Sequence, residues 1–274
     1  MTAKPTLSYH YHAHGHGFSA QFGRPLQHTV EVQAASSLPI IGGYGASRVD
    51  NFKFNEIVSF KAAYSHVSGS RDEHDGSHTS LVTATVEGLN VLDVVTSDRI
   101  VARLAAHHLP GKEEPSIIPL GSKFENLRIA GCPVEIELDC ELFCECDTHG
   151  EFKKRFEKDK KFRELVEERF LWGKLEKDVP EFIQKRYNWA GQKGLLESHG
   201  VVLCSLVKNV ETTCPGVKRY GHVLVVPQFG RVFLAELFLK QSQRTLVMVR
   251  LELGSPVSGD LTVAQAINNG HTWP

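Results

Sequence analysis

The chain has 274 residues, of which 41% are hydrophobic and 23% are charged, and its formal net charge at pH 7 is -1. This composition is ordinary for a globular protein, and a chain of this length can build a sizeable core. The balanced charge excludes a nucleic-acid partner, because duplex affinity requires a basic surface. No apolar run reaches the length of about 18 residues that a membrane span requires. The opening residues, MTAKPTLSYHYH, lack the apolar stretch of a secretory signal, which predicts a cytoplasmic location.

The first predicted element is a β-strand near the N-terminus, over residues 8–18 (SYHYHAHGHGF). Successive strand side chains point to opposite faces, so one face carries imidazoles and the other carries Tyr9, Tyr11, Ala13 and Gly15. Two imidazoles two residues apart on one face can reach the same zinc, nickel or copper ion at about 2.0 Å. The candidate metal ligands are therefore His10, His12, His14 and His16.

A closed metal site needs a third ligand from elsewhere in the chain. The histidines considered for this role are His28, His66, His74, His78, His199 and His222. The polar segment 70–80 (SRDEHDGSHTS) could supply ligands, or it could be an ordinary hairpin loop that turns at Gly76. The histidine strand itself could equally be an exposed or interface strand without an ion, because coordination is decided by tertiary geometry.

Three segments that follow also predict strands. Residues 28–34 (HTVEVQA) alternate, residues 54–67 are rich in aromatic and branched side chains, and residues 79–95 indicate two strands hinged at EGLN. Their short spacing favours antiparallel pairing.

Residues 133–146 (PVEIELDCELFCEC) predict a further half-buried strand. Alternation would place Cys140, Cys144 and Cys146 on the apolar face and the acidic residues on the opposite, solvated face. The alternative is a zinc or iron–sulfur site that these cysteines form with His149. The even number of cysteines in so large a chain favours free thiols.

Residues 151–190 interrupt the strand pattern, because they are dense in Lys, Glu and Arg and almost free of β-branched residues. Their apolar positions predict an amphipathic helix, a break near Gly173 and a second short helix after Pro180. The chain therefore divides into a first β part (1–150), a helical insertion (151–198) and a closing β part (199–274).

The C-terminal part predicts a long hairpin of strands 231–240 and 244–254. Apolar residues occupy nearly every position of both strands, which is typical of strands covered on both faces. Glu236 is the one acid within the first of them, and we expect it to pair with Arg250 on the neighbouring strand.

Three blocks of the chain, in this order, resemble sequences of the choice-of-anchor class of bacterial surface proteins. The blocks are LVTATVEGLNVLDVVTSDRIVARL, SKFENLRIAGCPV and FGRVFLAELFL. The resemblance covers about a third of the chain. It implies an all-β, non-catalytic protein of the cell surface or envelope, and it assigns no functional residues.

These features predict a mainly β protein, an antiparallel β-sandwich with an α-helical insertion. Neither a nucleotide-binding loop nor a nucleophile elbow is present in the sequence. The long apolar strands favour a non-catalytic structural or interaction protein that self-associates into a homo-oligomer through β surfaces. One alternative is a metal-binding protein or metal-dependent hydrolase that uses the N-terminal His-x-His run with a transition metal such as zinc. Another is a carbohydrate-binding β-sandwich.

Overall fold

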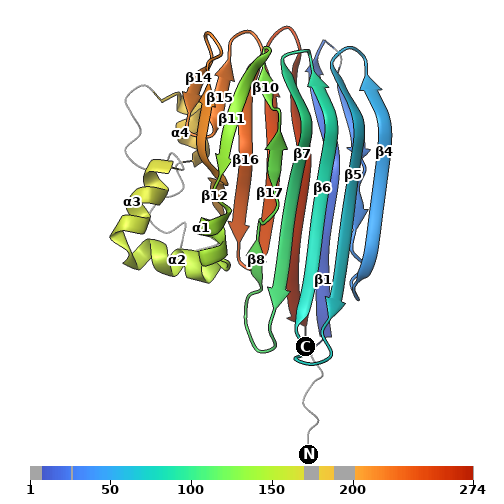
Figure 1. Cartoon of the computed structure of the whole chain (residues 1–274), viewed down its shortest axis with the longest axis vertical. Helices are drawn as coiled ribbons and strands as arrows, with labels where there is room; N and C mark the ends of the chain where they lie inside the picture. Colours follow the sequence, from blue (N-terminus) through green and yellow to red (C-terminus); the bar gives the residue numbers. More distant parts are fainter. Residues whose placement is uncertain (1–7, 26, 170–178, 188–200, 274) are drawn as a thin grey trace, which may run out of the picture.

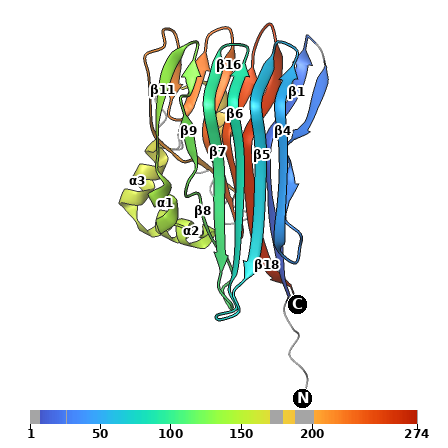
Figure 2. The ribbon, with the colours of Figure 1, turned by 45° about the vertical axis from the view of Figure 1, so that its right-hand side comes forward.

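A computed structural model describes residues 8–25, 27–169, 179–187 and 201–273. In these residues two nine-stranded antiparallel sheets pack face to face, and four helices lie together on one side of them (Figure 1). This confirms the predicted fold class, a mainly β sandwich with a small helical insertion. Figure 2 shows β4–β7 of one sheet in front of β1, β16 and β18 of the other.

Sheet 1 contains both ends of the described chain. Its strands, in spatial order, are β14 (Lys218–Tyr220), β15 (Val223–Val226), β16 (Gly230–Lys240), β17 (Gln243–Leu253), β18 (Ser258–Trp273), β1 (Ser8–Arg24) and β2 (His28–Gln33). Two short strands join it from the side: β12 (Val202–Ser205) pairs with β16, and β3 (Ser36–Ser37) pairs with β1. The predicted C-terminal hairpin is confirmed as β16 and β17.

Sheet 2 is built from the middle of the chain. Its strands, in spatial order, are β13 (Val207–Thr212), β11 (Cys132–Leu138), β10 (Arg128–Ile129), β7 (Val95–His108), β6 (His78–Val91), β5 (Val58–Arg71) and β4 (Gly43–Phe54). Two short strands, β8 (Ser116–Ile118) and β9 (Lys123–Glu125), pair with β7.

The core lies between the sheets and is mostly apolar. Phe18 and Phe22 of β1 and Ile100 and Leu104 of β7 are all at most 2% exposed. Buried polar contacts also join the sheets: Ser80 donates a hydrogen bond of 2.8 Å to Asn268 Oδ1, and the hydroxyls of Ser36 on β3 and Ser65 on β5 are 2.7 Å apart. A buried amide needs such partners to offset its loss of water.

The hinge predicted at EGLN is wrong, because β6 continues through these residues to Val91. Gly88 lies inside the strand with φ +65°, and an added Cβ there would lie 2.7 Å from Cγ of Lys61 on β5. Glycine is therefore needed for a local irregularity within the strand and not for a turn. The chain turns later, at Leu92 and Asp93, which both have φ +54°.

The strand predicted over 133–146 is correct only as far as Leu138. Helix α1 (Cys140–Glu145) follows, because the Asp139 carboxylate accepts a hydrogen bond of 3.0 Å from the Leu142 backbone N–H. Asp139 is also paired with Arg169 at 2.8 Å, so it does not face water as the alternation predicted.

The predicted long amphipathic helix is two helices, α2 (His149–Lys158) and α3 (Lys160–Arg169). The break occurs at Asp159, whose backbone is extended and whose carboxylate accepts hydrogen bonds from the backbone N–H groups of Lys161 and Phe162. The predicted break at Gly173 lies outside the described residues. The short helix after Pro180 is confirmed as α4 (Glu181–Tyr187).

No helix in the described ranges has both the length and the apolar composition for crossing a bilayer.

A buried carboxylate connects α4 to sheet 1. Glu236 on β16 is fully buried and pairs with Arg250 Nε on β17 at 2.8 Å, as predicted, and with Arg186 Nε on α4 at 2.9 Å. Tyr187 donates a further hydrogen bond of 2.6 Å to it. Burial raises the pKa of Glu236, but the charges of Arg250 and Arg186 outweigh this effect and lower it to about 2. The carboxylate is therefore ionised at neutral pH and holds α4 against the sheet.

His222 lies beside this group and is also buried. Its Nε2 is 2.9 Å from the Tyr187 hydroxyl, which itself donates to Glu236, so the ring nitrogen is the donor to Tyr187. Nδ1 is buried and has no hydrogen-bond partner among the described residues. Burial lowers the pKa of His222 to about 4, because a proton on Nδ1 would be held without water or an acceptor.

We expect His222 to make folding sensitive to acid. Above about pH 6.5 the ring is neutral in both states, whereas toward pH 4 only the unfolded chain takes up the proton, which destabilises the fold by on the order of 3 kcal/mol. His222→Gln keeps a donor for Tyr187 and does not titrate. Urea unfolding at a series of pH values should show a smaller loss of stability in this variant, and equal losses would contradict the account.

Candidate functional site

The four predicted histidines lie on the outer face of sheet 1. Along β1, Tyr11, Ala13 and Gly15 are buried toward sheet 2, and the residues between them face outward. The outward residues are His10, His12, His14 and His16, here called the imidazole row. The predicted strand and its two faces are thus confirmed.

The structure adds a fifth imidazole that the sequence did not reveal. β1 pairs with β18 along most of its length, and in this register His271 lies directly opposite His10. The rings of His12 and His271 are stacked, with centroids 5.2 Å apart, and those of His10 and His271 are 6.4 Å apart. Only the alternation of the C-terminal segment could have suggested this residue, and alternation does not identify the partner strand.

The other histidines considered as third ligands have different surroundings. His28 stacks on Phe54, and His78 stacks on Tyr9. His66 shares a hydrogen bond with the Tyr44 hydroxyl. His222 is buried under α4, and His74 lies in the hairpin loop between β5 and β6, where Gly76 has φ +72°. His199 lies outside the described residues.

No three ligand side chains already converge on one point within the described ranges. The cysteines that the alternative metal site would use are unbridged. Cys140 lies 3.6 Å from the carbonyl oxygen of Pro119, and Cys146 lies 3.7 Å from the guanidinium of Arg155. Burial raises the pKa of all three thiols in this set, so they are protonated at neutral pH.

The imidazole row is electrostatically coupled. Partial burial lowers the pKa of His14, and the charge of His12 lowers it further. Burial also lowers the pKa of His271, with His12 and His10 as the charged neighbours. For His16 the causes are burial and the charge of His14. These three rings are therefore neutral at pH 7, which is the state that binds metal ions.

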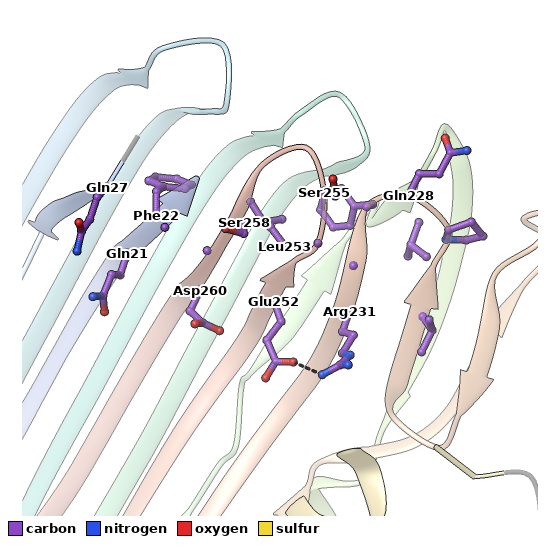
Figure 3. A pocket seen from close by; sticks show the side chains of 18 residues that line it. Gln21, Phe22, Gln27, Gln228, Arg231, Glu252, Leu253, Ser255, Ser258 and Asp260 are labelled. Carbon is purple, nitrogen blue, oxygen red and sulfur yellow. Dashed lines mark hydrogen bonds and ion pairs between the residues drawn. The ribbon is translucent and has the colours of Figure 1, made fainter. Parts of the chain in front are cut away.

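A second surface is a hollow of about 1120 Å³ on the same sheet, near the turns that follow β15 and β17. Figure 3 shows four polar side chains side by side on its wall, from four adjacent strands. Here called the polar row, they are Gln21, Asp260, Glu252 and Arg231, each directly opposite the next in register.

The two acids of the polar row differ in their environment. Glu252 forms ion pairs with Arg250 at 2.5 Å and Arg231 at 3.0 Å. Burial opposes its ionisation, but these cations outweigh burial and lower the pKa of Glu252. Asp260 has no ion pair with any described residue, and burial together with the charge of Glu252 raises its pKa.

A third surface is an apolar corner between β3 and β4. Ile40, Ile41 and Tyr44, here called the apolar corner, are 51%, 89% and 64% exposed. Ile41 is the most exposed large hydrophobic side chain of the described residues. Exposed apolar residues that adjoin one another mark interaction sites more often than isolated ones do.

The protein is a large antiparallel β-sandwich with a helical insertion. The three surfaces described above are open and do not form an enclosed site. The family described as Domain of unknown function (DUF8256) matches residues 9–240, which is most of the chain. The protein therefore belongs to this family. No curated protein and no solved structure matches the chain.

We expect His12→Gln to change the titration of two neighbouring rings, that of His14 on the imidazole row and that of His271 on β18. Removing the His12 charge should raise the pKa of both His14 and His271, because that charge is a cause of each lowered value. His16 is the internal control, since its neighbouring charge comes from His14. An NMR titration of the imidazole signals measures all three. Unchanged values for His14 and His271 would show that the row is not coupled as described.

Proposed function

We propose that this protein is a non-catalytic interaction protein that self-associates through the side of the sandwich formed by β3 and β4. The apolar corner is the observation that carries the proposal. Burying an isoleucine side chain stabilises an interface by about 1.5–3 kcal/mol. Two adjacent isoleucines are 51% and 89% exposed, so burying both in an interface would contribute substantially to the free energy of association.

The apolar corner is held by backbone hydrogen bonds, which supports a preformed surface. The Tyr11 N–H donates to the carbonyl of Ile40 at 3.0 Å, and the Leu38 N–H donates to that of Ala13 at 2.8 Å. The Gly42 N–H closes the turn onto Pro39 at 2.9 Å, with Gly42 at φ +91°. A partner that binds here need not order a loop, which reduces the entropic cost of association.

A second copy is the partner that the adjoining strand fits. β4 pairs only with β5 among the described strands, so its other edge offers free backbone groups. The half of β4 next to the corner, residues 43–47, carries no charge, whereas Arg48, Asp50 and Lys53 protect the other half. Charged edge residues discourage strand addition, and uncharged ones permit it. The contact is therefore expected at residues 40–47.

We expect the double substitution Ile40→Ser and Ile41→Ser to weaken self-association by at least about tenfold, since apolar burial is lost in both copies. Sedimentation velocity over a range of concentrations measures the effect. Leu120→Ser is the matched control, because Leu120 is 58% exposed between β8 and β9, outside the proposed contact. A wild-type protein that stays monomeric at the highest concentration would overturn the proposal, as would equal effects of the two changes.

A second candidate function is the binding of a polyhydroxylated ligand, such as a carbohydrate, at the polar row. Its support is the register that places an amide, two carboxylates and a guanidinium on four adjacent strands. Directly opposite strand residues have Cβ atoms about 5 Å apart, so the four side chains form a continuous polar row that can hydrogen-bond to several hydroxyl groups of one ligand.

If the polar row binds glycans, Asp260→Asn should abolish or strongly reduce the signals that the wild-type protein gives on a glycan array. Asp260 is exposed and forms no ion pair within the described part of the chain, so the change should leave the fold intact. Glu211→Gln, an exposed change on β13 of the opposite sheet, is the control and should bind as wild type does. An array without wild-type signals would eliminate this function.

A further inference from the structure

We propose that His10, His12 and His271 form a binding site for a transition-metal dication of the zinc class. The two strands that carry them are antiparallel neighbours. His10 and His12 are two residues apart on the outer face of β1, and His271 lies opposite His10 on β18. A pair from one strand and a third residue from its neighbour therefore share one end of the outer face, although their rings do not converge on one point in the described structure.

The ring separations are close to those that coordination requires. A zinc ion lies about 2.0–2.1 Å from each nitrogen, so two imidazoles at a tetrahedral angle have centroids roughly 5 Å apart. The observed separations are 5.2 Å for His12 and His271 and 6.4 Å for His10 and His271. The rings of His12 and His271 are parallel, at 6°. Convergence therefore requires rotation of side chains and no movement of the strands.

Asn269 provides an independent observation at the same place. It lies directly opposite His12 on β18, two residues from His271. Its Oδ1 is buried and accepts no hydrogen bond within the described part of the chain. A buried amide oxygen without a donor is unfavourable, and ligating histidines characteristically donate their second N–H to such an acceptor. Asn269 is thus positioned to orient a ligand ring or to bind a metal-bound water.

The same register distinguishes one end of the imidazole row from the other. His14 and His16 lie opposite Ile267 and Gln265, which supply no imidazole. Among the described residues, an imidazole from the paired strand is available only at the end of the row that faces His271. The proposed site therefore keeps two of the four ligands predicted from the sequence and replaces the others with His271.

The test is a zinc titration of the full chain without an affinity tag, in competition with a chromogenic chelator. The wild-type protein should bind one equivalent of Zn²⁺, and Co²⁺ in its place should give the visible absorption of a four- or five-coordinate ion. His271→Gln should weaken Zn²⁺ binding by at least about tenfold. His16→Gln is the matched control and should bind Zn²⁺ as tightly as wild type.

Three outcomes would overturn the proposal. The first is a wild-type protein that binds well below one equivalent of Zn²⁺. The second is an affinity that His271→Gln leaves unchanged, and the third is an equal loss in His16→Gln. Asn269→Leu supplies a second readout, because it removes no ligand. It should lower the affinity by about 10- to 100-fold if Asn269 orients a ligating ring. Far-ultraviolet circular dichroism of each variant shows whether the sheet is intact.

Discussion

The antiparallel pairing of β1 with β18 is the constraint on which the remaining structure depends. It joins the first and last described strands of the chain, from Ser8 opposite Trp273 to Arg24 opposite Ser258. These two strands lie between β17 and β2 in sheet 1. The register also fixes which residues face out, because a slip of one position would turn every side chain to the other face. With this register, Phe18 and Phe22 are buried and the imidazole row is outside.

The helical insertion depends on a different interaction. Glu236 is enclosed by apolar neighbours on β16, where an isolated charge would be strongly unfavourable. Arg250 from the neighbouring strand and Arg186 from α4 compensate for this charge together. Removing either cation would leave a buried carboxylate incompletely paired. The position of α4 is therefore specified by the charge beneath it as well as by apolar packing, and the burial of His222 follows from the same contact.

The sequence predicted those features that depend on neighbours along the chain. Alternation identified the two faces of β1, the C-terminal hairpin and the partner of Glu236, because strand period and cross-strand charge pairing are local rules. It failed at Asp139, where a carboxylate that caps a helix overrode an apparently continuous strand pattern. It failed at Gly88 as well, because a glycine within a strand and a glycine at a turn look alike in sequence. His271 could not be predicted, since its relation to His10 arises only when the two ends of the chain pair.

The most direct test of this pairing and of the imidazole surface it creates is anomalous diffraction at the zinc absorption edge. Crystals of the full chain would be equilibrated with Zn²⁺. The account predicts a principal anomalous peak about 2.0–2.1 Å from a ring nitrogen of each of His10, His12 and His271. A map without a peak there, or with its principal peak at the cysteines of α1 or between His14 and His16, would contradict it.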